Sequence, residues 1–134
     1  AGPAPALPYL DWALPSFEEA KALTGEPKAL RQARRFQEAG AKNVAVKMGA
    51  NGCLVVPADG EPFHMAPLKV DAVDALGAGD AWVAGFLVGL LEGWPLDRTA
   101  RFANAVGACC VQALGATTGI RSRAETLALL DEAA

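Results

Sequence analysis

The residues best suited to chemistry lie in one segment, residues 74–80, which reads DALGAGD. Its small residues allow a ligand to approach the backbone closely, and a helix is expected to begin at Gly77. The first amides of such a helix carry free N–H groups, and the helix dipole favours an anion beside them. Asp80 falls in this first turn, where its carboxylate can accept a proton from a nucleophilic hydroxyl.

An anion-binding helix start beside a carboxylate base is the combination that phosphoryl transfer requires, so the segment predicts a phosphoryl-transfer site. A simpler interpretation is also open, in which Asp80 complements the helix dipole and the glycines serve helix packing. The Walker pattern G-x-x-x-x-G-K-[ST] does not occur in the sequence, so a P-loop does not explain the segment.

The pattern Asp-x-x-Gly-Ala-Gly-Asp, followed by a small and an aromatic residue, resembles the carboxy-terminal signature of the PfkB family of sugar kinases. In that family the last Asp activates the sugar hydroxyl, and the Gly-Ala-Gly amides hold the γ-phosphate. The resemblance therefore implies Asp80 as the base, with Gly77, Ala78 and Gly79 forming the anion hole. Residues 75–76 are Ala and Leu where the family often has two Thr, which removes hydroxyls near a candidate cation site.

An upstream segment, residues 14–25 (LPSFEEAKALTG), resembles the family's Asn-x-x-Glu segment. Glu19 falls on the family's Glu, which helps to hold hydrated Mg²⁺, whereas Ser16 replaces the Asn. The same two residues also form the pattern of a helix capping box, Ser at the N-cap and Glu at N3, which needs no metal. Both interpretations stay open at this point.

Two further segments resemble the parts of the family that hold ATP. Residues 46–52 (VKMGANG) resemble the strand and loop against the nucleotide phosphates and ribose. Residues 102–105 (FANA) resemble the segment beside the adenine, although an Asn within a helix can also simply face solvent. The residues implied in ATP binding are Lys47, Gly49, Ala50, Asn51, Gly52, Gly79 and Asn104.

Residues 115–119 (GATTG) resemble the loop that closes the cation and nucleotide side of the family's site. Some members bind a monovalent cation through an Asp at the position of Asp74 and through backbone carbonyls of that loop. The cofactors implied by the resemblance are therefore ATP and Mg²⁺, with K⁺ as a further candidate.

The elements that must position these residues alternate between strands and helices, which predicts an α/β fold. Pro27 is expected at the first position of the second helix. The helix over residues 81–91 is apolar on both faces, which predicts burial between layers, and Gly85 and Gly89 would let another backbone approach it. The expected strands are 9–14, 44–48, 53–56 and 63–65, and the expected helices are 16–24, 27–39, 77–92, 96–114 and 122–132.

Composition excludes several classes of protein. The chain has 134 residues, 52% hydrophobic and 20% charged, which is typical of one globular domain. A net charge of −3 without a long basic run argues against nucleic acid as a partner, and the longest apolar stretch is too short to span a membrane. Three cysteines, two of them adjacent, form no disulfide framework, which favours buried thiols in the cytoplasm.

The resemblance covers nearly the whole chain from about residue 14 and implies part of a ribokinase-like three-layer α/β/α fold, with an incomplete sheet and no lid. Residues 1–134 would be the carboxy-terminal, nucleotide-binding and catalytic-base portion of a sugar kinase domain. The implied activity is ATP-dependent phosphoryl transfer to a hydroxyl of a sugar or sugar acid. The alternative is a nucleotide-binding module without kinase activity in isolation.

Family members are roughly twice as long, and their amino-terminal half supplies most sugar contacts. A half-sheet would expose an edge strand and an apolar helix face. We therefore expect either self-association or the amino-terminal half of a kinase to cover them.

Overall fold

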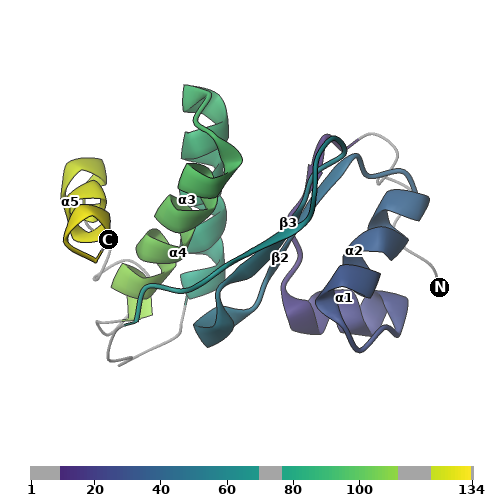
Figure 1. Cartoon of the computed structure of the whole chain (residues 1–134). Helices are drawn as coiled ribbons and strands as arrows, with labels where there is room; N and C mark the ends of the chain where they lie inside the picture. The colour runs from purple at the N-terminus through teal and green to yellow at the C-terminus, as the bar shows by residue number, and fades with distance from the viewer. Residues whose placement is uncertain (1–9, 70–76, 112–121, 134) are drawn as a thin grey trace. The chain divides into compact units, whose positions relative to one another are not determined.

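The computed structural model describes residues 10–69, 77–111 and 122–133, which belong to two compact units. One unit comprises residues up to 49 together with 53–64, and the other comprises residues 50–52 together with 65 onward. The fold is mixed α/β, as expected, with one open sheet of four strands in the order β1-β2-β3-β4 (Figure 1). The strands are Trp12–Ala13 (β1), Asn43–Lys47 (β2), Cys53–Val56 (β3) and Phe63–Met65 (β4).

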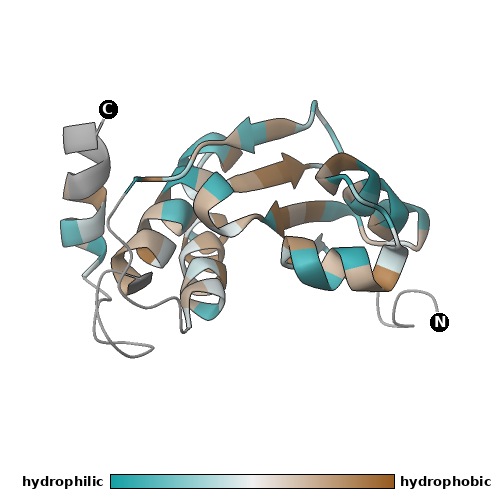
Figure 2. Cartoon of the chain, turned by 90° about the horizontal axis from the view of Figure 1, so that it is seen from below, coloured by the Kyte–Doolittle hydropathy of each residue, from teal (hydrophilic) through white to brown (hydrophobic). Residues whose placement is uncertain are grey.

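β2 and β3 carry the apolar residues of the sheet in the first unit. β1 pairs with β2 in parallel, and β2 pairs with β3 antiparallel, with Val44 opposite Val56. Because side chains alternate across a strand, Val44, Val46 and Val56 share one face, where they form a core with buried residues of the first two helices. β3 is hydrophobic along its whole length, and its residues are buried or nearly so (Figure 2).

The first helix, α1 (Phe17–Thr24), begins and ends at the residues that the sequence predicted. The Ser16 side chain accepts from the Glu19 amide at 3.1 Å, and the Glu19 carboxylate accepts from the Ser16 amide at 3.0 Å, so the capping box is confirmed. Gly25 ends the helix with a φ of 73°, a left-handed conformation that glycine adopts without strain.

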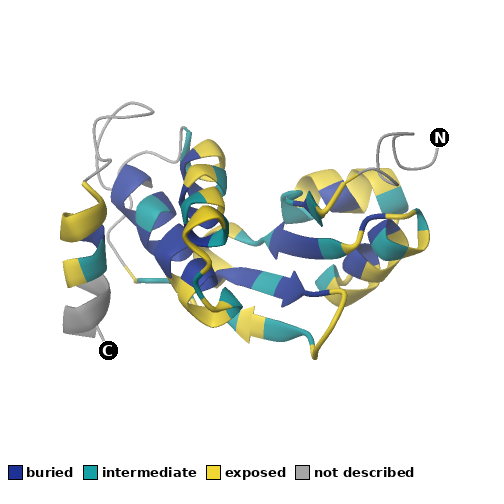
Figure 3. Ribbon diagram, turned by 90° about the horizontal axis from the view of Figure 1, so that it is seen from above, coloured by how far each residue is buried: buried dark blue, intermediate teal, exposed yellow. Residues whose placement is uncertain are grey.

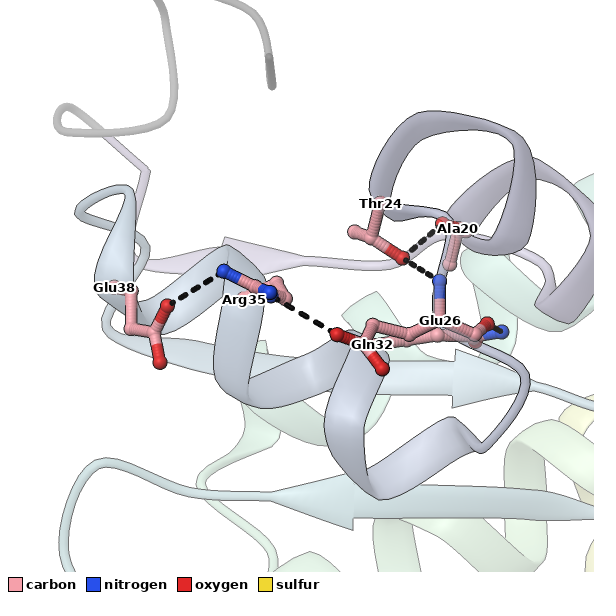
Figure 4. Close-up of polar contacts among 6 residues, drawn as sticks. All are labelled: Ala20, Thr24, Glu26, Gln32, Arg35 and Glu38. Carbon is pink, nitrogen blue, oxygen red and sulfur yellow. Dashed lines mark hydrogen bonds and ion pairs between the residues drawn. The ribbon is translucent and has the colours of Figure 1, made fainter.

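The second helix, α2 (Ala29–Glu38), begins two residues later than the sequence predicted, so Pro27 does not occupy its first position. The chain bends at residues 27–28, and side chains of α2 hold the residue before this bend, Glu26 (Figure 4). Gln32 Nε2 donates to the Glu26 carbonyl at 3.0 Å, and Arg35 Nε contacts the Glu26 carboxylate at 3.1 Å. α1 and α2 lie on the same side of β2 and β3 (Figure 1).

The second unit is built on two antiparallel helices, α3 (Ala78–Glu92) and α4 (Leu96–Val111), with α5 (Arg123–Ala133) against α4. The expected close approach at Gly85 is confirmed, because a Cβ there would lie 3.1 Å from the Cα of Ala103. At Gly89 a Cβ would overlap the buried side chain of Thr99. Arg123 joins α5 to α3 through an ion pair with Glu92 at 2.8 Å.

The apolar faces of α3 predicted burial between layers, but the helix is buried on one side and leaves apolar residues exposed on the other, as expected of an incomplete sheet. Trp82 and Phe86 are buried on the side that faces α4, but Leu87 is 45% exposed and Leu91 is 88% exposed on the other side (Figure 3). An all-apolar helix is buried only as far as its neighbours reach, and α4 covers one face. No helix among the described residues is long and apolar enough to cross a membrane.

Candidate functional site

The candidate site begins at the start of α3, where the structure places residues 77–80 in one turn. Gly77 is the N-cap with a φ of 77°, which a residue with a Cβ adopts only with strain. Its carbonyl accepts the first helical hydrogen bond, from the Ala81 amide at 2.9 Å. Among the described residues no side chain caps this helix start. The first amides of any helix have no intrahelical acceptor, so the amides that follow Gly77 can receive an anion.

Asp80 lies in this first turn and is exposed, as is Gly79, whereas Gly77 and Ala78 are half-buried. A carboxylate that is accessible beside unpaired amides can take a proton from an approaching hydroxyl while the amides hold an anionic group. This is the local geometry that the sequence pattern predicted, and it follows from the helix start alone.

The loop implied in nucleotide binding forms a single 3₁₀ turn, η2 (Gly49–Asn51), followed by Gly52. Gly49 has a φ of 54° and no atom within 4 Å of the position of a Cβ, so its backbone is open to a ligand on that side. Gly52, with a φ of 83°, is buried, and a Cβ on it would collide with the carbonyl of Met65. The backbone of residues 65–67 therefore supports this loop directly.

Asn104 lies inside the second unit and not on a solvated helix face, since it is only 7% exposed. Its Oδ1 accepts from Trp82 Nε1 at 2.8 Å, and its Nδ2 donates to the carbonyls of Met65 at 3.2 Å and Ala66 at 3.0 Å. The sequence pattern pointed to Asn104 and did not point to Trp82. An indole placed two residues after the candidate base is a signal that would have suggested a hydrogen-bonding role.

Glu19 and Lys47 lie in the first unit, near the beginning of α1. Hydrogen bonds from the Ser16 backbone and side chain are the main cause that lowers the pKa of the Glu19 carboxyl. Burial opposes them with a smaller effect, and the charge of Lys47 lowers the pKa slightly further. Glu19 is therefore an exposed carboxylate at neutral pH, with Oε1 in the capping box. The capping box accounts for Ser16 and for one carboxylate oxygen of Glu19.

A metal site can be tested against these residues. Among the residues that the structure describes, no three His, Cys, Asp or Glu side chains come together to hold an ion. Magnesium bound chiefly by phosphates and water needs no such cluster, and a single exposed carboxylate such as Glu19 fits an outer-sphere contact. Asp74, residues 75–76 and the loop 115–119 lie outside the described residues.

The α/β fold thus places the first amides of α3 and the accessible carboxylate of Asp80 in one turn. The chain belongs to the pfkB family of carbohydrate kinases, because the model of that family matches residues 4–123.

Relatives agree with this assignment. The chain is 34% identical to the ribokinase of Haemophilus influenzae over 132 residues, which are 95% of this chain and 43% of that protein. Its fold matches that of Arabidopsis thaliana ribokinase complexed with ribose and ATP, with a TM-score of 0.86 at 31% identity over 92% of this chain and 42% of the other. A putative ribokinase II from Escherichia coli, in complex with ATP and Mg²⁺, matches with a TM-score of 0.86 at 30% identity. The match covers 95% of this chain and 41% of that protein. The chain thus spans less than half the length of these relatives.

Proposed function

We propose that this chain forms the nucleotide-binding and catalytic-base portion of an ATP-dependent carbohydrate kinase, equivalent to the carboxy-terminal part of the family domain. The acceptor is a hydroxyl of a sugar or sugar acid. The observation that carries the proposal is the start of α3, where uncapped amides follow Gly77 and the Asp80 carboxylate lies exposed beside them.

In the proposed reaction, Asp80 accepts the proton of the sugar hydroxyl as its oxygen attacks the γ-phosphorus of ATP. A bond forms between that oxygen and phosphorus, and the bond to the β-γ bridging oxygen breaks, so that ADP leaves with the electron pair. The amides of residues 78–80 stabilise the charge on the transferring phosphoryl group. The loop of residues 49–52, with Lys47 before it, borders the nucleotide phosphates and ribose.

The proposed cofactors are ATP and Mg²⁺. The ion would neutralise phosphate charge and meet Glu19 through water, which the exposed, ionised state of that carboxylate favours. The complexes of the Arabidopsis and Escherichia coli relatives with ATP support this role of ATP, and the second of them, which also holds Mg²⁺, supports Mg²⁺. K⁺ at Asp74 and the loop 115–119 is part of the proposal on the resemblance alone.

A second candidate function is nucleotide binding without turnover by this chain in isolation. It is favoured by the chain's span of 43% of the Haemophilus ribokinase and by the exposed apolar residues Leu87 and Leu91 on α3. Self-association or the amino-terminal portion of a kinase would cover that face.

Three buried cysteines, none in a disulfide, support a reducing compartment such as the cytoplasm.

The test is calorimetric titration of the chain with Mg·ATP, together with an assay for ADP formation on a panel of sugars and sugar acids. We expect Mg·ATP binding that Asp80→Asn preserves, because the base contacts the acceptor hydroxyl. Where turnover is present, Asp80→Asn should lower kcat by roughly two to four orders of magnitude. Binding without turnover would support the second candidate, whereas a folded chain that binds no Mg·ATP would refute the nucleotide site.

A further inference from the structure

One hydrogen-bonded side chain connects three backbone segments of the second unit. Asn104, on α4, accepts from the indole of Trp82 on α3 and donates to the carbonyls of Met65 and Ala66. Trp82 is 5% exposed and Asn104 is 7% exposed, so these bonds are shielded from water. Shielded hydrogen bonds are costly to break, because the groups left behind find no solvent partner.

Each end of this connection reaches a segment of the proposed site. Trp82 follows Asp80 by two residues in the first turns of α3, so the indole bond holds the helix start that carries the base. At the other end, the carbonyl of Met65 stands against Gly52, with no space for a Cβ between them. Moving the 65–66 backbone therefore moves the end of the nucleotide loop.

The hydrogen-bond capacity of Asn104 decides how it can act. A side-chain amide has two N–H donors, and both are already used on the carbonyls of Met65 and Ala66. Asn104 therefore has no donor left for the ring nitrogens or phosphates of a nucleotide. The influence of Asn104 on nucleotide binding that these contacts support passes through the groups that it holds.

We infer that Trp82 and Asn104 are positioning residues that couple the Asp80 turn to the nucleotide loop at Gly52 through the backbone of residues 65–66. The inference rests on the proposed function for its ligand, Mg·ATP. It replaces a direct contact between Asn104 and the adenine by an indirect one. The Asn104 side chain acts on the shape of the nucleotide loop, and its effect does not depend on which nucleobase the nucleotide carries.

Two variants separate the halves of this connection. Trp82→Phe removes the indole donor but keeps an aromatic ring for the stack on Phe86, whose centroid lies 4.9 Å away. Asn104→Asp keeps an acceptor for Trp82 but loses both donors to the 65–66 carbonyls. The control for Trp82→Phe is Trp94→Phe, where the indole packs edge-on against Phe102. The control for Asn104→Asp is Asn43→Asp, because the Asn43 side-chain amide also donates to a backbone carbonyl but lies in the first unit.

The first readout is amide hydrogen exchange of residues 50–52 and 65–66 in the nucleotide-free chain, measured by NMR on variants shown to be folded by urea titration. Loss of a buried hydrogen bond should speed exchange of both segments by roughly 10-fold in Trp82→Phe and Asn104→Asp. The two control variants should exchange at the wild-type rate in these segments. Unchanged exchange at residues 50–52 in both test variants would overturn the inference.

The second readout is the affinity for Mg·ATP and for Mg·GTP. An effect through the loop backbone should weaken both nucleotides by the same factor, roughly 10-fold, and keep their ratio at the wild-type value. A loss confined to Asn104→Asp, with a collapsed preference between ATP and GTP, would show direct base contact and would overturn the inference. If the wild-type chain binds neither nucleotide, the proposed function fails, while the exchange data still decide whether the coupling exists.

Discussion

The packing of α3 on α4 allows a sharp prediction at Gly89. Replacing this glycine by Ala adds a Cβ that would lie 2.8 Å from the Cβ of Thr99 and 2.5 Å from its Oγ1, closer than such atoms approach in proteins. Thr99 is fully buried and its hydroxyl donates to the Pro95 carbonyl at 3.1 Å, so it cannot simply rotate away. The substitution must therefore push the two helices apart.

The magnitude follows from two opposing effects. Overpacking of a buried contact costs about 1–3 kcal/mol. Replacing a helical Gly by Ala returns about 1 kcal/mol through helix propensity. We expect Gly89→Ala to lower the free energy of unfolding by up to about 2 kcal/mol, because the steric cost exceeds the propensity gain.

Gly107 in α4 provides the matched control. A Cβ there would lie 3.5 Å from the Ala78 carbonyl oxygen and 3.7 Å from the Trp82 Cβ, which are ordinary contact distances. Gly107→Ala should therefore raise the free energy of unfolding by about 0.5–1 kcal/mol through propensity alone.

Urea unfolding followed by far-ultraviolet circular dichroism measures both variants, with the midpoint and the m-value compared to those of the wild type. The expected result is a midpoint that falls for Gly89→Ala and rises for Gly107→Ala at a constant m-value. If Gly89→Ala stabilised the chain as much as Gly107→Ala does, the close approach of α3 and α4 at Thr99 would be refuted.

Three further predictions concern the cap, the loop and the exposed face. Because the pKa of Glu19 is lowered in the folded chain, its carboxylate contributes stability that is present above the ordinary value of 4.5 and is lost as the pH falls through the lower folded value. Urea midpoints measured from neutral to acidic pH should show this loss of stability in the wild type. In Glu19→Gln, the part of the pH dependence that comes from the Glu19 carboxylate should be absent. Gly52→Ala should unfold at a lower urea concentration than the wild type. Its Cβ would meet the Met65 carbonyl, and a φ of 83° is strained for Ala. An unchanged urea midpoint would contradict that contact. Leu91→Glu should leave the free energy of unfolding within about 0.5 kcal/mol of the wild type, because Leu91 is 88% exposed, while reducing any concentration-dependent association seen in light scattering.

The elements that sequence patterns predicted well are those whose signals are local. The capping box of Ser16 and Glu19, the stop at Gly25 and the strands 53–56 and 63–65 are confirmed, because each depends on residues within a few positions of one another. The start of α3 at residues 77–80 was predicted for the same reason. A helix N-terminus presents its free amides whatever the rest of the fold does.

The errors of prediction arose where a distant partner decides the outcome. Pro27 has the chemistry of a helix start, but the chain bends at residues 27–28, and Gln32 and Arg35 hold Glu26 before this bend. The apolar composition of residues 81–91 predicted burial between layers, yet the amount of burial depends on how many neighbours pack against the helix. In this chain α4 leaves Leu87 and Leu91 exposed.

The sequence by itself determined the family, the α/β class and the candidate base Asp80, because a short run of residues carries each of these signals. Only the tertiary structure decided what Asn104 does. Its partners lie 22 residues away at Trp82 and 39 residues away at Met65, and no local pattern links them. Their meeting depends on the packing of α4 against α3 and of the 65–66 segment against Gly52, since a hydrogen bond forms only where folding brings a donor within about 3 Å of an acceptor.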